Sequence, residues 1–471
     1  MELNFEDLNI KLLIEIAYFA AAILFIMGLK AMSSPVTARR GITWAGIGML
    51  VATLVSFTYP DMHNYIPMTA AILIGGIIAW WTGKRVAMTD MPQMIALYNG
   101  MGGGSAAAIA AVELVRLQSP GGELTLPGPV SQVLAVLGAL IGTIAFSGSM
   151  IAFAKLQGWM RKVYRFKGQQ IFNLAVFAAL LYFGWILLGD GFGPNELMIF
   201  FGLALLVGVL MTIGIGGADM PVVISLYNAL TGLAVGFEGF VLQNPAMMIA
   251  GIVVGSAGTL LTQLMAKAMN RSLGNVLFSS FGTGDDGGSS VEVSGIMKAI
   301  DAADAAITMA YAETVIIVPG YGMAVAQAQH KVWELTKILQ EKGVRVSFAI
   351  HPVAGRMPGH MNVLLAEAGV PYDLIYDLED INSQFPTADV ALVIGANDVV
   401  NPAARKDTSS PIYGMPILDA DKAHNVFVIK RGQGTGFSGI ENLLFFEDNT
   451  RMCYGDAQDV AQKLITGVKA L

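Results

Sequence analysis

Hydrophobic positions follow two different patterns along the chain, and the change falls near residue 270. Residues 8–268 hold nearly all of the long apolar runs. A hydrocarbon core about 30 Å thick needs roughly 20 apolar residues of helix. The pattern therefore predicts a multi-pass membrane domain of about nine helices. The runs lie near 8–29, 41–59, 64–82, 91–115, 129–154, 170–188, 195–215, 221–242 and 245–267.

The remainder of the chain has the texture of a soluble α/β domain. An amphipathic helix is expected over 323–342, between buried strands. The expected strands are Thr314–Val318, Val344–Ile350, Val390–Ile394 and Asn425–Ile429. Gly, Ser and Asp dominate Phe278–Ser290, as in flexible linkers. We therefore predict a transmembrane domain (1–270), a linker (271–294) and a Rossmann-like parallel-sheet domain (295–471).

Composition and charge narrow the classes of protein to which the chain can belong. Hydrophobic residues make up 54% of the chain and charged residues only 13%, against about 25% charged in soluble proteins. The formal net charge of −7 gives no indication of nucleic-acid binding. The single cysteine, Cys453, excludes an internal disulfide framework. We predict no metal site.

Lysine and arginine are distributed unequally between the two sides of the predicted helices. One side collects most of them, from Lys30 and Arg39 to Lys267 and Arg271, whereas the other holds only Lys11 and Arg116. Because cytoplasmic loops keep the positive charge, we expect the C-terminal domain to lie in the cytoplasm.

The membrane part contains an internal repeat. Thr89–Gly100 matches Ala218–Ala229, and both segments contain Asp-Met-Pro from their second residue and Leu-Tyr-Asn further on. Asp90 and Asp219 suit helix N-caps with proline in the first turn, so a structural role competes with a functional one. The glycines nearby are typical of close helix packing in lipid.

Asn99 and Asn228 occupy equivalent positions in the two repeats. Each lies about 13.5 Å along its helix from the preceding aspartate, close to the middle of the bilayer. A polar side chain at this depth indicates a functional site. The alternative is a helix–helix hydrogen bond between the two asparagines, worth about 0.6 kcal/mol.

A glycine turn follows the first predicted strand of the soluble domain. Gly320, Gly322 and Val325 give the pattern G-x-G-x-x-(small) between a strand and a helix. Such glycines let the backbone approach a pyrophosphate at a helix N-terminus. The arrangement favours dinucleotide binding over a purely structural turn.

The type of dinucleotide follows from the ends of the later strands. NAD-binding domains usually carry an acidic residue after the second strand, but here the segment His351–Arg356 contains none. Lys430 and Arg431 end another strand beside a glycine-rich loop, which suits an extra phosphate. NADP is favoured over NAD, although a solvated basic pair is the alternative. Asp398, in the loop after Val390–Ile394, is the leading ionisable candidate.

Several strings together resemble a known family, the β subunit of proton-translocating NAD(P) transhydrogenase. They are Gly217–Val223, Pro319–Gln329, His351–Leu365, Gly395–Asp398 and Asn401–Ala404. The resemblance implies hydride transfer between NADH and NADP⁺, coupled to proton translocation across a bacterial inner membrane. It also implies an α subunit that binds NAD(H) and adds transmembrane helices, in a dimer of αβ units.

Residue roles are carried over with the same resemblance. Asp398, Asn228, Asn99 and Asp219 are implied in proton coupling. The residues implied in NADP(H) binding are Gly320, Tyr321, Gly322, Ala324, Val325, Arg356, Gly395, Asn397, Asp398, Lys430 and Arg431.

Two departures from the family pattern qualify this expectation. Asn99 stands where the family often has a titrating histidine, and Phe437 stands where tyrosine is expected. Because asparagine does not titrate, we hypothesise that an α-subunit residue supplies that group. A channel or transporter gated by a nucleotide-sensing Rossmann domain is the alternative function, although the sequence shows neither a filter loop nor a broken-helix site.

Overall fold

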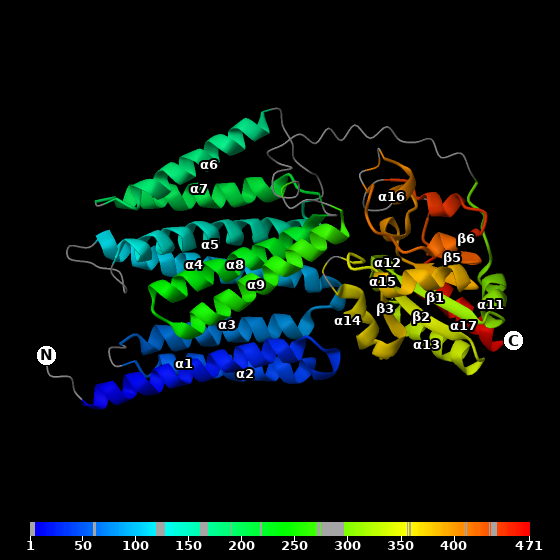
Figure 1. Ribbon diagram of the computed structural model, residues 1–471, viewed down its shortest axis with the longest axis horizontal. Coiled ribbons are helices and arrows are strands. Elements are labelled where there is room, and N and C mark those ends of the chain that lie inside the picture. The colour runs from blue at the N-terminus through cyan, green and yellow to red at the C-terminus, as the bar shows by residue number, and fades with distance from the viewer. Residues whose placement is uncertain are drawn as a thin grey trace. The chain divides into compact units, whose positions relative to one another are not determined.

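The computed structural model divides into two compact units, one chiefly Met1–Ile215 with Val223–Thr262 and the other chiefly Thr283–Leu471. We call them the membrane unit and the sheet unit (Figure 1). The structure describes residues 5–59, 63–118, 128–160, 168–189, 191–216, 219–270, 274, 296–355, 357, 359–408, 410, 412–432, 434 and 440–471. Apart from Gly274, the predicted linker 271–294 lies outside the described residues.

The described residues of the N-terminal part form nine long helices. Eight of these are long and apolar enough to cross a membrane, which confirms the predicted multi-pass membrane fold. The helices are α1 (Phe5–Met32), α2 (Pro35–Ser56), α3 (Tyr65–Arg85), α4 (Met91–Gln118), α5 (Pro129–Leu156), α6 (Gln169–Ile186), α7 (Pro194–Ile213), α8 (Met220–Val241) and α9 (Pro245–Ala268). The helix outside the eight is α2, in which Arg39 and Arg40 fall within every 18-residue stretch.

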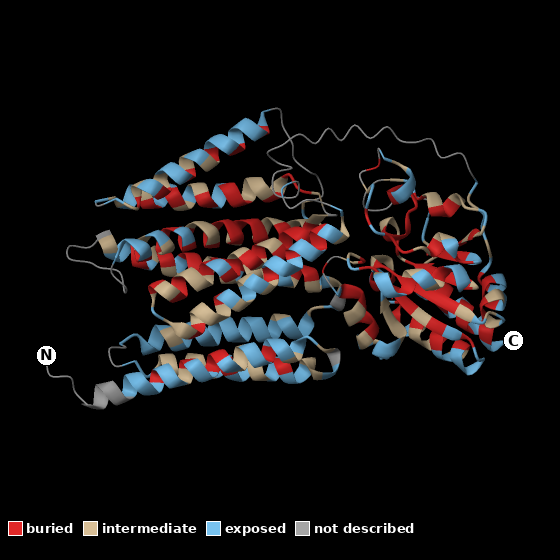
Figure 2. Ribbon diagram, viewed as in Figure 1, coloured by how far each residue is buried: buried red, intermediate tan, exposed pale blue. Residues whose placement is uncertain are grey.

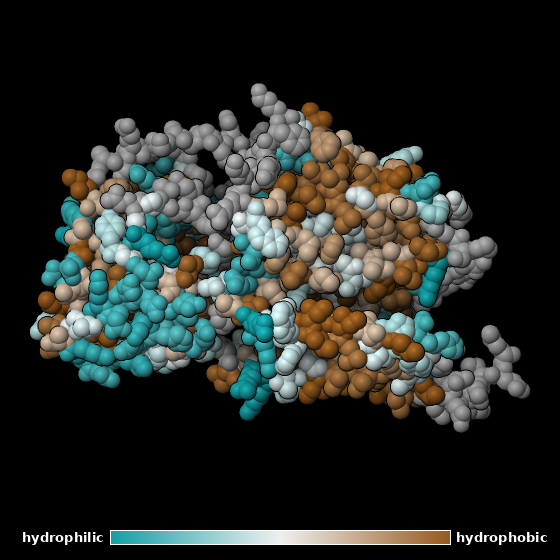
Figure 3. Space-filling view, turned by 180° about the vertical axis from the view of Figure 1, so that it is seen from behind, coloured by the Kyte–Doolittle hydropathy of each residue, from teal (hydrophilic) through white to brown (hydrophobic). Residues whose placement is uncertain are grey.

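Apolar side chains cover much of the outside of the membrane unit. Figure 3 shows hydrophobic residues gathered over these helices, whereas hydrophilic residues dominate the visible face of the sheet unit. Exposure is extreme in α3, which has no buried residue, while half of α5 is buried (Figure 2). A lipid-facing exterior explains this distribution, because bilayer hydrocarbon solvates apolar side chains.

Glycines set the distance between the inner helices. A Cβ atom on Gly103 of α4 would lie 2.9 Å from the Gly142 carbonyl oxygen of α5. In the same way, a Cβ on Gly232 of α8 would lie 2.8 Å from Cα of Gly255 in α9. Both approaches are tighter than a side chain permits, which supports a packing role for these glycines.

The sheet unit contains one six-stranded parallel sheet in the order β3-β2-β1-β4-β5-β6. This is the doubly wound order of Rossmann folds, and it confirms the predicted fold class. The strands are β1 (Thr314–Pro319), β2 (Arg345–Ile350), β3 (Ile375–Asp377), β4 (Val390–Ile394), β5 (Asn425–Lys430) and β6 (Thr450–Tyr454). The helices are α11 (Ala302–Ala310), α12 (Tyr321–Val325), α13 (Gln329–Glu341), α14 (His360–Glu367), α15 (Leu378–Ile381), α16 (Ala403–Lys406) and α17 (Ala457–Lys469).

The single helix predicted over 323–342 is divided in two. The short α12 ends at Val325 and α13 begins at Gln329, with Gln327 between them at φ 51°. A left-handed residue cannot continue an α-helix. The amphipathic pattern therefore gave the helix type correctly, but it did not reveal the break.

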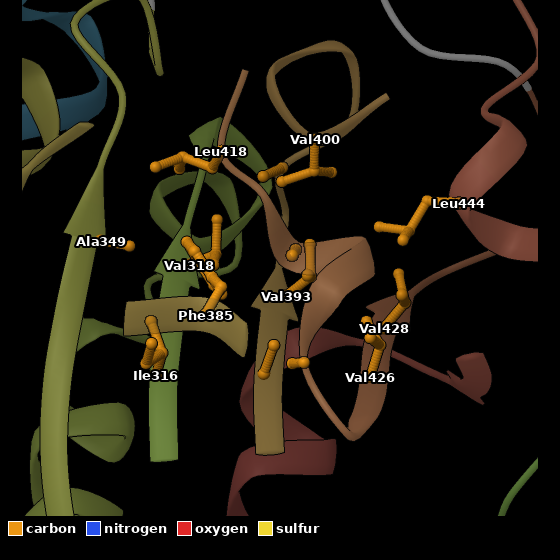
Figure 4. Packing of buried hydrophobic residues seen from close by; sticks show 14 of the residues in the cluster. Ile316, Val318, Ala349, Phe385, Val393, Val400, Leu418, Val426, Val428 and Leu444 are labelled. Atoms are coloured by element: carbon orange, nitrogen blue, oxygen red, sulfur yellow. The ribbon is translucent and has the colours of Figure 1, made fainter. Parts of the chain in front are cut away.

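Branched and aromatic side chains form the core on one face of the sheet. Alternate residues of the central strands, such as Ile316, Val318 and Val393, point to this face and are fully buried. They pack against Phe385 and Leu444 from the connecting segments (Figure 4). This packing fixes the strand ends from which the candidate residues project.

Candidate functional site

The carboxyl ends of β1 and β4 form the switch point of the sheet, where strand order reverses direction. In doubly wound sheets the ligand crevice opens at this position. Gly320 follows β1 and Gly395 follows β4, so the structure brings both sequence-predicted turns to the same edge.

Backbone contacts lock these two turns together. The Gly320 amide donates to the Ile394 carbonyl at 2.9 Å, and the Gly322 amide donates to the Gly395 carbonyl at 3.0 Å. Gly395 adopts φ +72°, and any Cβ there would run into the Met323 backbone. The glycines are thus required for contact between two loops, in addition to any close approach of a ligand.

The remaining residues of the first turn differ in accessibility. Ala324 is buried, whereas 43% of Val325 is exposed. Tyr321 is half-buried and its ring lies 6.1 Å from that of His360, which begins α14. Tyr321 and Val325 therefore offer side-chain surface at this edge.

Asparagine side chains hold the loop after β4. Asn442 donates through Nδ2 to both the backbone oxygen and Oδ1 of Asn397, at 2.9 Å each. Asn401 donates to the Glu441 carbonyl at 3.0 Å. Asp398 lies between the two bonded positions and is half-buried. The network fixes the backbone on either side of this carboxyl group.

Two cations stand at the end of β5. The Lys430 ammonium lies 4.6 Å from the ring centroid of Phe445 and bonds to the Gly434 carbonyl. Burial lowers the pKa of Lys430 from its ordinary value. Arg431 is exposed, with Nε 3.7 Å from the Asp456 carboxylate. Because such a surface pair is weak, Arg431 remains able to bind an anion.

The end of β2 carries a histidine. His351 is buried, its Nε2 lies 2.7 Å from the Pro416 carbonyl, and its Nδ1 accepts from the Val353 amide at 3.2 Å. Burial lowers its pKa to about 4, so the ring is neutral at pH 7. The acid beside the end of β2 is Asp377, the last residue of β3, which is the register partner of Ile350.

Two sequence-predicted features fall outside the described residues. They are Arg356 and most of the glycine-rich loop, including Phe437. Of that loop, Gly432 and Gly434 have open space around them.

In the helical N-terminal part of the chain, the two repeats begin helices as predicted. Asp90 directly precedes α4 and Asp219 directly precedes α8, with proline as the second residue of each helix. Gln93 donates to Asp90 Oδ1 at 3.2 Å.

The two asparagines have different surroundings. Asn99 donates to Ser149 Oγ of α5 at 3.0 Å, and its backbone carbonyl accepts from Thr231 Oγ1 of α8 at 3.4 Å. Asn228 is half-buried. The side-chain amide of Asn99 is thus held by serine and not by the second asparagine.

Comparison with known proteins agrees with this architecture. A profile described as "NAD(P) transhydrogenase beta subunit" matches residues 14–467. The NAD(P) transhydrogenase subunit beta of Rhodospirillum rubrum is 47% identical over 462 residues, covering 95% of this chain and 97% of its own. The same subunit from a designated strain of that species gives the same values.

The chain belongs to the NAD(P) transhydrogenase β-subunit family. It is therefore a membrane protein and an enzyme subunit that uses nicotinamide nucleotides, and an α subunit is its partner. The gated channel considered from the sequence is not favoured by this membership.

Sequence reasoning missed several supporting residues of this family member. Asn442 and Ser149 lie far along the chain from Asn397 and Asn99, so no local pattern links them. Asn401 stood within a string that carried the resemblance, but its role emerged only from its bonds to the segment 441–443.

Proposed function

We propose that this subunit binds NADP(H) at the carboxyl edge of its sheet and exchanges hydride with NAD(H) held by the α subunit. In this proposal the exchange is coupled to proton translocation. The observation that carries it is the basic pair at the end of β5, Lys430 and Arg431, combined with a neutral histidine at the end of β2. A 2′-phosphate needs cations where NAD sites place an acid.

The residues present fit such a nucleotide. Gly320, Gly322 and Gly395 keep side chains away from the switch point, and Arg356 is assigned to the phosphates by family resemblance. When bound, the nicotinamide supplies the hydride chemistry. The chain itself has to orient the nucleotide, through Tyr321, Ala324, Val325, Gly395 and Asn397, and to exclude water.

Asp398 links this site to proton movement in the proposal. It is ionisable, half-buried and held between two asparagine-bonded positions. Protonation of a carboxyl near the nicotinamide side can bias the site between two nucleotide affinities.

The transmembrane helices supply the proton path in this proposal, through Asn99, Asn228 and Asp219 at the start of α8. We place the protein in a bacterial inner membrane with the sheet unit in the cytoplasm, because positive residues concentrate on one side of the helices. Helices of the α subunit complete the path, and two αβ units form the assembly.

The decisive experiment compares two ligands. Lys430→Ala should weaken NADP⁺ binding by about 10- to 100-fold, because a charge-assisted hydrogen bond contributes about 1.5–3 kcal/mol. NAD⁺ binding, which lacks the 2′-phosphate contact, should change less than about twofold. Calorimetry on the assembled αβ complex, with its NAD(H) site blocked, measures both.

Asp377→Asn is the matched control, since it neutralises the acid at the end of β3. It should leave the preference for NADP⁺ unchanged. Equal losses of both ligands in Lys430→Ala would contradict the proposed role of the basic pair. A strong gain in NADP⁺ preference in Asp377→Asn would instead assign the ribose pocket to β3.

A further inference from the structure

An acidic side chain is fully enclosed in the membrane unit. Glu238, in the last turn of α8, has 0% of its surface exposed. Within the described part of the chain, neither carboxyl oxygen has a hydrogen-bond partner. The group presses against α5, where a Cβ on Gly138 would lie 3.0 Å from Glu238 Cδ. An unpaired carboxylate is far costlier to bury than the neutral acid, so the resting group carries a proton.

A second acid lies near enough to interact with it. Glu113 of α4 is 2% exposed, and Arg116 Nη1 lies 2.7 Å from its carboxylate. The Glu113 charge acts on Glu238. Two neighbouring carboxylates resist simultaneous ionisation. Glu113 has an arginine partner, whereas the enclosed Glu238 has none among the described residues, so the proton is held on Glu238. Among the described residues of α4, α5, α8 and α9, the other titratable side chains are Tyr98, Lys155, Tyr227 and Lys267, and all four lie toward the opposite ends of these helices.

Helical geometry connects this acid pair with the asparagine layer. Glu113 follows Asn99 by nearly four turns of α4, so both lie on about the same face. Glu238 follows Thr231 by nearly two turns of α8, again on one face. Thr231 contacts Asn99 at 3.4 Å. The helix faces that meet at Asn99 are therefore those that carry the two acids.

Helix α5 also carries its two contact residues on one face. Gly138 precedes Ser149 by about three turns of α5, which places both on one face. Ser149 bonds to Asn99, and Gly138 contacts Glu238. One seam between α4, α5 and α8 thus runs from a central amide to a buried acid.

We propose that Glu238 is a proton-binding residue of this subunit, which takes up and releases a proton on the seam that leads to Asn99. An O–H bond forms on its carboxyl oxygen at uptake and breaks at release. This inference rests on the proposed coupling to proton translocation. It supplies within this chain the titrating group that Asn99 cannot provide, whereas the sequence had suggested only the α subunit as its source.

The test uses the complete αβ enzyme in sealed vesicles. Glu238→Gln keeps the size of the side chain but cannot titrate, so it should reduce proton movement, followed by a pH-sensitive dye during transhydrogenation, at least tenfold. NADP⁺ binding should stay within twofold of wild type. Glu238→Asp retains a carboxyl and should restore part of the proton movement with an altered pH profile. Proton movement in Glu238→Gln within twofold of wild type would overturn the inference.

Glu196→Gln provides the matched control. Glu196 also lies in the membrane unit, but its carboxylate accepts the Gly193 amide at 2.9 Å, a bond that glutamine can retain. This variant should move protons normally. Failure of the proposed function is distinct, because wild-type vesicles themselves would then show no proton movement.

A spectroscopic measurement keeps the inference testable if Glu238→Gln does not assemble. The infrared spectrum of the wild-type complex should contain a protonated-carboxyl band that shifts in D₂O and moves in Glu238→Asp. Absence of such a band would contradict a proton on Glu238. A purely structural acid would give the band but no change in proton movement in the aspartate variant.

Discussion

His351 and Lys430 lie at the ends of two strands, and they differ in how deeply their side chains are buried. Burial lowers the pKa of both side chains from their ordinary values. For His351 the pKa falls to about 4, so the ring is neutral at pH 7 and holds Pro416 through a hydrogen bond. Lys430 is only half-buried and rests on an aromatic ring, so its side chain remains accessible to a phosphate.

The neutral histidine predicts a pH-dependent stability of the sheet unit. Its folded pKa of about 4 lies below the ordinary value of 6.5. Stability is therefore complete above pH 6.5 and is lost as the pH falls toward 4, where the unfolded chain binds the proton more readily. The loss is on the order of 3 kcal/mol at most. Urea unfolding of the full chain, followed by circular dichroism at several pH values, measures it.

His351→Gln should flatten this pH dependence, because glutamine keeps hydrogen-bonding capacity without titrating. His330→Gln, at an exposed position on α13, should not alter it. Parallel curves for wild type and His351→Gln between pH 6.5 and 4 would disprove the assignment.

At the scale of elements, the loops after β1 and β4 depend on one backbone conformation. Gly395 and Gly343 both have positive φ, +72° and +86°. A Cβ on Gly395 would strike the Met323 backbone, whereas a Cβ on Gly343 meets nothing within 4 Å. A substitution at Gly343 therefore tests backbone strain alone, whereas a substitution at Gly395 tests backbone strain together with steric conflict.

Alanine at the two positions should give unequal results. Gly343→Ala should cost about 1–2 kcal/mol of unfolding free energy, the left-handed strain alone. Gly395→Ala should cost a further 1–3 kcal/mol for overpacking and should weaken NADP⁺ binding about tenfold or more. Urea unfolding and calorimetry on the same preparations test this. Equal destabilisation by the two substitutions would mean that the loops after β1 and β4 can move apart at no cost in free energy.

The elements were predictable to different degrees. Buried apolar runs gave β1, β2, β4 and β5 within one residue of their observed ends, because a parallel strand covered on both faces is continuously apolar. The outer strands β3 and β6 were not predicted, since β3 has three residues and β6 carries Arg451 among its five. The break at Gln327 left no trace in the helical periodicity.

The candidate site was predictable only in its local parts. Glycine turns and the basic pair follow from order along the chain, because parallel strands place their carboxyl ends on one edge. The bonds Asn442–Asn397 and Asn99–Ser149 join distant segments. The burial of Glu238 depends on Gly138 of another helix, so the sequence could place the acid near a helix end but could not show its enclosure.

At the scale of the whole molecule, a parallel-sheet unit and a unit of membrane-spanning helices share one chain. Hydride exchange between the two nicotinamide pools is nearly balanced on its own. One charge that crosses about 180 mV releases about 4 kcal/mol, at 2.3 kcal/mol per 100 mV. This corresponds to about a thousandfold change in product ratio, which is large enough to set the direction of the reaction.

An ionophore should therefore abolish the bias and leave the chemistry intact. In energised vesicles that contain both subunits, the NADPH/NADP⁺ ratio should exceed the NADH/NAD⁺ ratio by up to about a thousandfold. An ionophore should return the two ratios to near equality, while the rate of exchange from NADPH to an NAD⁺ analogue persists. The two ratios are measured enzymatically after quenching. If the ionophore leaves both nucleotide ratios unchanged, proton movement across the membrane does not drive the hydride exchange, whatever Lys430 and Glu238 contribute individually.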